Sequence, residues 1–289
     1  MEPSLPLGPA DLGLTVSADT RLEHGWLVRD LELPRGLDGP PGILQGGFAA
    51  GLAASIARLV DPYGAPLTSI HARLHAPSPL GERVRAVVRS IGPARYEVET
   101  RSATATLVTA EVELAGQEPP PATLDLLSLA SVPLKAAVPQ EEYPSCFVCG
   151  SAPEHPLGLR LHPRPGPPGT IIQPFVADEA LAVGPAGAAG GVLDPLVVAA
   201  VLDCPTVWAA IDPLRAAGYA GALLAGFRLT SYRDAPIAEP LRIVARCDAI
   251  DGRKVHARAA LIDEEGTLYA LVAALHVAVT AIPDLRPPS

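Results

Sequence analysis

The sequence has few charged residues and no run of basic ones. Lysine and arginine number 22 against 31 aspartates and glutamates, so the net charge is −9, and charged residues make up only 18% of the chain. A surface that binds nucleic acid needs clustered Lys and Arg, and the sequence therefore argues against such a partner. Hydrophobic residues make up 48%. This balance is the opposite of that in disordered chains and predicts a globular protein.

Membrane and secretion signals are also missing. No uncharged apolar run reaches the roughly 18 residues that a membrane-spanning helix needs. Residues 1–13 lack the basic and apolar regions of a signal peptide. The 4 cysteines are too few and too scattered for a disulfide scaffold. We therefore expect a soluble, cytoplasmic protein with no membrane partner.

Periodic patterns predict strands and two apolar helices. Apolar residues alternate with Arg and Glu in 83–91 and in 95–101, and Gly92-Pro93 between them indicates a hairpin. Residues 46–60 carry one charge, Arg58, and predict a helix buried on nearly all sides. A second apolar helix is expected over 190–211, interrupted by Pro195 and Pro205. The other expected strands are 68–76, 107–114, 223–232, 241–250, 254–262 and 267–279.

The same order of elements occurs twice, which indicates an internal repeat. Gly46-Gly47 aligns with Gly190-Gly191 at an offset of 144 (190 − 46), and residues 79–82 align with 236–239 at an offset of 157 (236 − 79). Residues 116–144 are rich in Pro and Ala and predict a linker. We predict an N-terminal unit at 15–117, a linker at 118–144 and a C-terminal unit at 145–282.

A buried helix followed by four strands, with Gly-Gly at the helix start, resembles the hot-dog fold of acyl-CoA thioesterases and dehydratases. The resemblance is carried by LQGGFAAGLAA (44–54), CFVCG…PLGLRL (146–161), LDCPTVWAA (202–210) and residues 251–275. It implies an α+β chain of two tandem hot-dog units, each an antiparallel sheet around one buried helix. It also implies an acyl-CoA or acyl-carrier substrate, a homodimer of double hot-dog chains, and no cofactor.

Hydrolysis of a thioester needs donors that stabilise an oxyanion and a base that activates water. Gly46-Gly47 and Gly190-Gly191, at the expected helix starts, offer free backbone N–H groups and the positive end of the helix dipole. They are therefore candidate substrate-binding or oxyanion positions. The alternative is that these glycines only let each helix pass close to the sheet.

The candidate base is Asp203. In hot-dog thioesterases a carboxylate commonly lies about two turns into the helix, and that position in the first half, at Ala54-Ser55, has no acid. Asp203 lies in the second apolar helix, where burial would raise its pKa toward neutrality and suit a general base. A local backbone cap is the alternative role for Asp203. Asp194, before Pro195, is interpreted as a helix N-cap rather than a base, and is retained as a candidate substrate-binding residue.

Gln45 stands where the resemblance implies a histidine. Gln donates and accepts hydrogen bonds but does not titrate, so it could orient water or the thioester carbonyl, with Ser55 as a polar partner. Gln45, Gly47 and Asp203 are expected to form one composite site between the two halves. Gly191 and Ser55 would form a degenerate second site.

Two other groups of residues could bind a metal ion. Cys146 and Cys149 are two ligands of the four that a structural zinc site needs, and no second pair follows them. We predict that they form a buried turn into the second unit, without a metal. His71 and His75 share a strand face, which is expected to be solvated or an interface rather than a metal site.

Three functions follow from these expectations. The first is hydrolysis of an acyl thioester by carboxylate-activated water. The second is non-catalytic binding of acyl groups or acyl-CoA in degenerate pockets, which the substitution of Gln45 for His favours. A dehydratase ranks last, because it needs a histidine and an acid in the pocket and the pattern shows no well-placed histidine.

Overall fold

The computed structural model describes residues 4–116, 120–121, 124–139, 141–183 and 191–286. Its helices are α1 (Gly46–Arg58), α2 (Pro195–Trp208) and α3 (Ile211–Ala216), with short 3-10 helices η1 (Ala10–Leu12), η2 (Asp125–Ser131) and η3 (Glu179–Leu181). The strands are β1 (Ser4–Pro6), β2 (Thr15–Ser17), β3 (Arg21–Glu23), β4 (Trp26–Glu32), β5 (Ser69–Leu74), β6 (Arg83–Gly92), β7 (Arg95–Arg101), β8 (Thr106–Glu113), β9 (Thr170–Val176), β10 (Gly221–Ser231), β11 (Pro240–Asp251), β12 (Lys254–Asp263) and β13 (Leu268–Val279).

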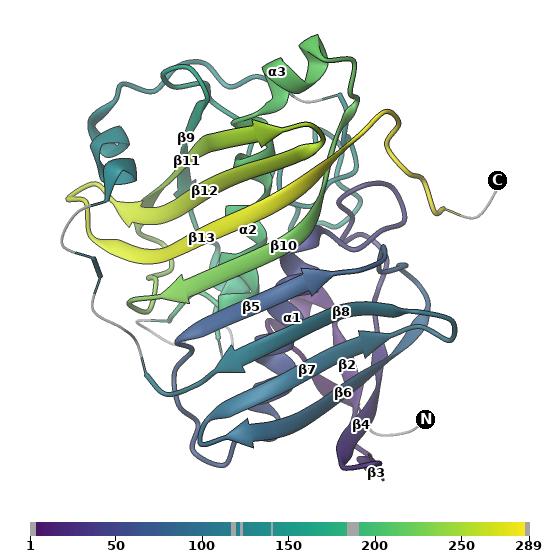
Figure 1. Ribbon diagram of the computed structural model, residues 1–289. Helices are drawn as coiled ribbons and strands as arrows, with labels where there is room; N and C mark the ends of the chain where they lie inside the picture. The colour runs from purple at the N-terminus through teal and green to yellow at the C-terminus, as the bar shows by residue number, and fades with distance from the viewer. Residues whose placement is uncertain (1–3, 117–119, 122–123, 140, 184–190, 287–289) are drawn as a thin grey trace.

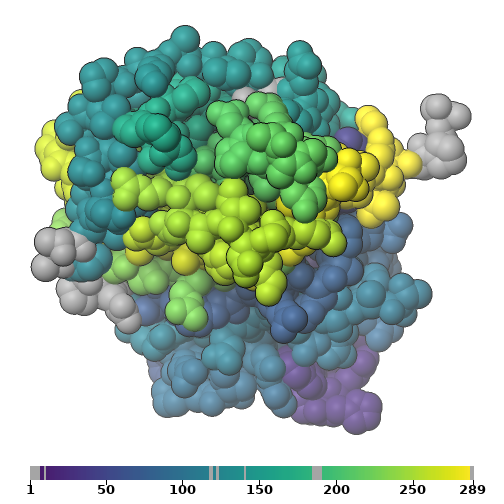
Figure 2. All heavy atoms as spheres, turned by 45° about the horizontal axis from the view of Figure 1, so that its top comes forward, coloured from purple at the N-terminus to yellow at the C-terminus, as the bar shows by residue number. Residues whose placement is uncertain are grey.

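The described strands form one antiparallel sheet, with α1 and α2 on the same side of it (Figure 1). The order is β1-β2-β4-β6-β7-β8-β5-β10-β13-β12-β11-β9, and β3 pairs with β4. Outward from the centre, β5-β8-β7-β6-β4 mirrors β10-β13-β12-β11-β9. The central strands β5 and β10 pair from Ser69↔Thr230 to Arg73↔Gly226. The space-filling view shows blue atoms of the first half packed against lime and yellow atoms of the second (Figure 2).

Both expected apolar helices are present and buried. Ala and Leu favour the helical conformation of α1. The helix packs against both the sheet and α2, so nearly all of its residues are buried. In α2 every residue from Leu196 to Trp208 is buried. Burial on all sides explains why neither helix has a polar face. Within the described part of the chain, no helix combines the length and apolar character needed to cross a membrane.

Two predictions about α2 are wrong. The helix begins at Pro195, with Asp194 as its N-cap, because the Asp side chain accepts the Leu196 N–H and Pro suits the first helical turn. Gly190 lies outside the described residues. Gly191 precedes the helix, and its carbonyl accepts the Ile237 N–H, so it is not at a helix start. Pro205 does not interrupt α2, which continues to Trp208.

The start of α2 changes the alignment of the two halves. Gln45 and Asp194 are the N-caps of α1 and α2. They are 149 residues apart (194 − 45), so the Gly-Gly match at an offset of 144 does not align the helices. The match of 79–82 with 236–239 has a structural counterpart, because Gly81 and Ala238 both adopt positive φ, at 75° and 59°. The unit boundaries proposed above remain a prediction.

The predicted linker contains an ordered element. Leu126 and Leu129 of η2 are buried in a small second core with residues of β9, β11, β12 and β13. Asp125 pairs with Arg246 at 2.7 Å and with Arg258 at 3.0 Å. These contacts hold part of the linker against the outer face of the sheet. Strands β1–β4 and β9 were not anticipated, and residues 159–161 form no regular strand.

Glycine lets α1 cross α2 closely. A Cβ on Gly47 would lie 2.3 Å from the Ala199 carbonyl oxygen and 2.7 Å from Ala200 Cα. The close neighbour is therefore the other helix rather than the sheet, which corrects the alternative considered for this glycine. The crossing brings the first turn of α1 beside the middle of α2, where Asp203 lies.

Candidate active site

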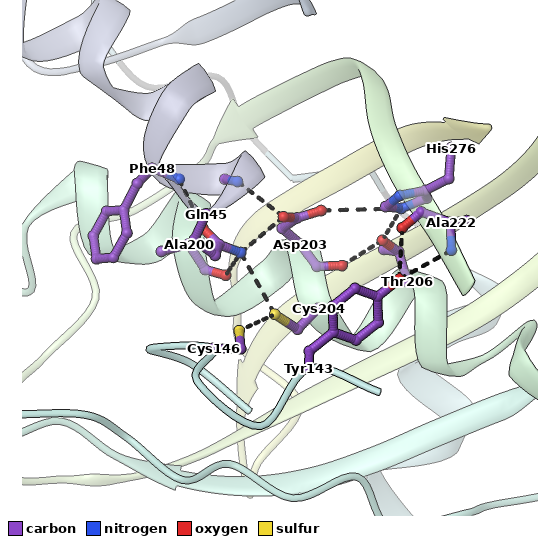
Figure 3. A network of polar contacts seen from close by, with 11 residues as sticks. Gln45, Phe48, Tyr143, Cys146, Ala200, Asp203, Cys204, Thr206, Ala222 and His276 are labelled. Carbon is purple, nitrogen blue, oxygen red and sulfur yellow. Dashed lines mark hydrogen bonds and ion pairs between the residues drawn. The ribbon is translucent and has the colours of Figure 1, made fainter. Parts of the chain in front are cut away.

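Gln45 connects the start of α1 to α2. Its Oε1 accepts the Phe48 N–H at 2.8 Å, which satisfies one free donor of the first helical turn. The same bond turns its Nε2 toward α2, where it donates to Asp203 Oδ2 at 2.7 Å and to the Ala200 carbonyl at 3.2 Å (Figure 3). Gln45 thus caps one helix and holds the carboxylate of the other.

The Asp203 carboxylate is buried at the N-terminus of α1. Its Oδ2 also accepts the Gly47 backbone N–H at 2.9 Å. Burial raises the pKa of Asp203 to about 7, although the Gly47 N–H lowers it. The carboxyl group can therefore gain and lose a proton near neutral pH, which is the property a general base requires.

His276 of β13 faces the other oxygen of Asp203. Its Nε2 lies 4.0 Å from Asp203 Oδ1 and 2.6 Å from Thr206 Oγ1. The Thr206 hydroxyl donates its single proton to the backbone carbonyl of Asp203 at 2.5 Å. The hydroxyl oxygen must therefore accept a hydrogen bond from His276, which places the ring proton on Nε2. Burial lowers the pKa of His276 to about 4. The ring is therefore neutral, and its Nε2–H group is held by Thr206 beside the Asp203 carboxylate.

Two adjoining cavities meet at Gly46. The first, called the Asp203 cavity, has a volume of about 60 Å³ and is bordered by Gln45, Asp203 and His276. The second, called the Leu44 cavity, has a volume of about 210 Å³ and a largely apolar lining. The residues that line both cavities are Pro40, Gly46, Leu223 and Leu224. The Asp203 cavity and the Leu44 cavity are therefore direct neighbours.

Larger hollows lie away from this carboxylate. One of about 510 Å³ runs over β5 and β10 and includes His71, Arg73 and Arg228; another of about 640 Å³ lies around Trp26 and Arg85. Their linings mix apolar residues with charged side chains, and neither lining includes a buried carboxylate. We therefore place the candidate active site at the Asp203 cavity.

Three cysteines border the same cavity. Cys146 and Cys149 are buried, as expected for a buried turn, and Cys204 of α2 joins them. The Sγ atoms of Cys146 and Cys204 are 3.7 Å apart, and Gln45 Nε2 lies 3.5 Å from Cys204 Sγ. Hydrogen bonds from the thiols of Cys149 and Cys204 lower the pKa of the Cys146 thiol well below its usual range.

The structure brings together Gln45, Gly47 and Asp203, as the composite-site prediction requires. It does not bring Ser55 to them: Ser55 lines neither cavity, and the bonds of the Gln45 side chain run to α2 and Phe48. Asp194 lies at the N-terminus of α2, where its side chain accepts the Leu196 N–H at 2.8 Å. The proposed degenerate site of Gly191 and Ser55 therefore has no geometric support.

Several residues of the site were missed in the sequence. His276 had a detectable signal, because it occupies an inward-facing position of β13 among otherwise apolar residues such as Val272 and Ala274. Tyr143 had none, because it lies at the end of the predicted linker. Thr206 and Trp208 are hidden in the apolar pattern of α2, and only the helix geometry directs them to the cavity region.

Solved structures show the same architecture, although no family model and no curated protein sequence matches the chain. A protein described as having a hot-dog fold, from Alicyclobacillus acidocaldarius, superposes with a TM-score of 0.53 at 12% identity, over 94% of this chain and 97% of that one. The chain has the hot-dog fold. This fold places α1 and α2 inside the curved sheet and the candidate site between them (Figure 1).

Two further structural neighbours are described as enzymes. The acyl-CoA thioesterase II TesB2 from Mycobacterium marinum superposes with a TM-score of 0.51 at 14% identity, over 93% of this chain and 97% of that one. The dehydratase domain of a mycocerosic acid synthase-like polyketide synthase gives a TM-score of 0.62 at 17% identity, over 97% and 100%. Identities this low establish the shared hot-dog fold and leave the activity to the site.

Tyr143 ties the linker to the strand beside the cavity, and its removal should destabilise the fold. The Tyr143 hydroxyl donates to the Ala222 carbonyl at 3.0 Å and accepts the Ala222 N–H at 3.1 Å. Tyr143→Phe leaves both buried groups unpaired, so we expect a loss of about 2 kcal/mol in the free energy of unfolding, measured in urea. Tyr63→Phe, at an exposed position, is the control. Equal stability of the two variants would contradict the structural role.

Proposed function

We propose that the protein hydrolyses acyl thioesters of coenzyme A or of an acyl carrier at the Asp203 cavity, and that its two halves are tandem hot-dog units. One observation carries the proposal. The buried Asp203 carboxylate is held by Gln45 Nε2 and the Gly47 N–H in a cavity that adjoins the larger, apolar Leu44 cavity. The thioesterase and dehydratase descriptions of the neighbours support a thioester substrate.

In the proposed reaction Asp203 takes a proton from water, and the oxygen of that water attacks the thioester carbonyl carbon. The C–S bond then breaks, and the proton returns from Asp203 to the departing thiolate. The products are a carboxylic acid and a free thiol. Burial of Asp203 favours proton uptake, because the carboxyl group is poorly solvated.

The backbone donor for the oxyanion is assigned to Gly46. The Gly47 N–H was expected to hold the carbonyl, but it donates to Asp203 instead. Gly46 lines both cavities and is the first residue of α1, where the N–H groups have no partner within the helix. A Cβ at this position would lie 2.8 Å from Asp203 Oδ2, so only glycine lets the carboxylate pack this closely against the start of α1.

Gln45 acts in this proposal as a positioning residue. Both ends of its amide are engaged, by Phe48 N–H on one side and by Asp203 and Ala200 on the other. It therefore holds the carboxylate rather than the water or the thioester. This role explains how an amide can occupy the place at which the hot-dog resemblance implies a titrating histidine.

The test is turnover of a panel of acyl-CoA thioesters that vary in chain length. Released coenzyme A is measured by chromatography with mass detection, since thiol reagents would also react with the cysteines of the protein. We expect catalytic release of coenzyme A from at least one member. Retention of acyl-CoA without release would favour the binding-protein alternative, and neither release nor retention would reject both.

A second candidate is dehydration of a 3-hydroxyacyl thioester, and one observation favours it. His276, which the sequence reasoning missed, places a neutral imidazole within 4.0 Å of Asp203 Oδ1. Loss of water requires a base for the proton on carbon and an acid for the departing hydroxyl. With its proton on Nε2, His276 is assigned the acid, and the Asp203 carboxylate the base. A 3-hydroxyacyl-CoA in the same panel separates the two reactions. Dehydration lowers the mass of the thioester by one water and releases no coenzyme A.

A further inference from the structure

Three cysteines from two distant segments form one cluster. The Sγ atoms of Cys146, Cys149 and Cys204 all lie within 4.8 Å of one another. Cys146 and Cys149 belong to the turn that follows the linker, and Cys204 belongs to α2, next to Asp203. Figure 3 shows the Cys146 and Cys204 sulfur atoms side by side below the Gln45 amide. The proposed hydrolysis uses none of these thiols.

We infer that Cys146, Cys149 and Cys204 form a binding site for Zn²⁺. This replaces the sequence-based prediction that Cys146 and Cys149 bind no metal, because the fold adds Cys204 as a third ligand. Tetrahedral zinc with Zn–S bonds of about 2.3 Å separates its sulfur ligands by about 3.8 Å. The Cys146 and Cys204 Sγ atoms are 3.7 Å apart, and the cluster's upper bound of 4.8 Å requires a contraction of at most about 1 Å. A set of thiolates selects a soft ion such as Zn²⁺ over Mg²⁺ or Ca²⁺.

The surroundings of the cluster suit thiolate ligands. Three thiolates and one Zn²⁺ carry a net charge of −1, which N–H donors can stabilise. Gln45 Nε2 lies 3.5 Å from Cys204 Sγ. The Trp208 indole N–H is buried and has no nitrogen or oxygen acceptor among the described residues, and Trp208 lines the same cavity as the three cysteines. Donors of this kind orient metal ligands and tune their basicity.

The fourth coordination position faces the Asp203 cavity. Structural zinc sites use four protein ligands, whereas sites with three keep a position for water or another small ligand. All three cysteines line the Asp203 cavity together with Gln45 and Gly46. The site is therefore of the open type, with solvent as its fourth ligand. It stands independently of the proposed hydrolysis, because binding of the ion needs no turnover.

A disulfide is the competing fate of these thiols. It would bring two sulfur atoms to about 2.05 Å and join only one pair. The third thiol would then remain buried beside the bond, with no role in it. Because Cys146 is close to Cys204 and shares a turn with Cys149, a metal ion is the arrangement that uses all three sulfur atoms.

The first test is the zinc content of the full-length protein, purified with reducing agent, before and after addition of Zn²⁺ and removal of the excess. We expect about one Zn²⁺ per chain, falling below about a tenth in Cys146→Ser and in Cys204→Ser. Cys247→Ser is the matched control, because Cys247 lies on β11 outside the cluster. It should retain the full content. Circular dichroism separates loss of the site from loss of the fold.

The second test needs no substitution, so it remains decisive if the serine variants do not fold. Co²⁺ added to the metal-free, reduced protein should give intense sulfur-to-cobalt charge-transfer absorption with one equivalent bound. Added cyanide or imidazole should shift the visible bands, because the fourth position is open. Two results would overturn the assignment. The first is that the reduced protein binds neither ion. The second is that mass mapping finds a disulfide among the three cysteines, which forms again on reoxidation after reduction and blocks both ions. If the zinc content is zero while Asp203→Asn abolishes hydrolysis, the metal site fails and the proposed function stands.

Discussion

Asp203→Asn is expected to lower the rate of acyl-CoA hydrolysis by about 10²–10⁴-fold. The amide oxygen can still accept hydrogen bonds from Gln45 Nε2 and the Gly47 N–H, but the amide cannot take a proton from water. The measurement is the initial rate of coenzyme A release from the best substrate of the panel. Because the group keeps its size and the one oxygen that accepts both hydrogen bonds, the loss should appear without a loss of folded protein.

The stability of the same variant gives a second readout with a defined sign. Burial raises the pKa of Asp203 to about 7, above its ordinary value of 3.8. The folded state therefore favours the protonated group, and stability is lost as the pH rises from about 4 through 7. At pH 8 the parent protein holds a buried, charged carboxylate, which lowers its free energy of unfolding. The neutral Asn removes this loss. We expect Asp203→Asn to unfold at the same or a higher urea concentration than the parent protein.

Asp38→Asn is the matched control. Asp38 is another buried carboxyl group whose pKa is raised by burial, and it accepts the Gly42 N–H at 2.6 Å. It lines neither the Asp203 cavity nor the Leu44 cavity. Its variant should hydrolyse acyl-CoA within about twofold of the parent rate. If Asp203→Asn and Asp38→Asn were equally active, Asp203 would be a structural residue.

Gly47→Ala is expected to lower the free energy of unfolding by about 3 kcal/mol, at the upper end of overpacking effects. The new Cβ would lie 2.3 Å from the Ala199 carbonyl oxygen, and backbone cannot move aside as a flexible side chain can. The two helices must separate, so the Gly47 N–H also moves away from Asp203 and activity should fall with stability. Urea unfolding and the hydrolysis rate measure the two effects.

Gly51→Ala, on the same helix, separates close approach from the general effect of replacing glycine. Its Cβ would lie 3.0 Å from Ala199 Cβ and 3.1 Å from Leu196 Cδ1. Shifts of a few tenths of an ångström relieve these two contacts. Alanine also favours the helix by about 1 kcal/mol over glycine. We expect a net change within about 1 kcal/mol. A loss as large as that of Gly47→Ala would show that the crossing is not specially tight at Gly47.

Local periodicity was enough to predict the central elements of the fold. The alternation in 83–91 and 95–101 corresponds to β6 and β7, and the apolar stretches at 46–60 and 190–211 contain α1 and α2. These patterns are readable because burial on one face of a strand, or on all faces of a helix, imposes its period on neighbouring residues. Strands β1–β4 and β9 were missed. The first three have only 3 residues each, too few to show a period, and β4 and β9 pair with β6 and β11, which lie more than 50 residues further along the chain.

Part of the candidate site was also predictable. Gln45 was named because it stands where the hot-dog resemblance implies a histidine, and Asp203 because it is a carboxylate inside an apolar helix. They were joined with Gly47 because the resemblance implies that the helix start of one half faces the helix middle of the other. Their actual bonding was not predictable. The Gly47 N–H holds the carboxylate and not the substrate carbonyl, and this depends on a helix crossing whose geometry no local pattern describes.

By itself, the sequence determined that two apolar helices and alternating strands would form, and that Asp203 would be buried, since these follow from side chains within a few residues of each other. Only the tertiary structure decided which residues meet. It placed His276 within 4.0 Å of Asp203 and Cys204 within 3.7 Å of Cys146. Those contacts join segments more than 50 residues apart, and they result from the strand register and the helix crossing, which depend on the packing of the whole core.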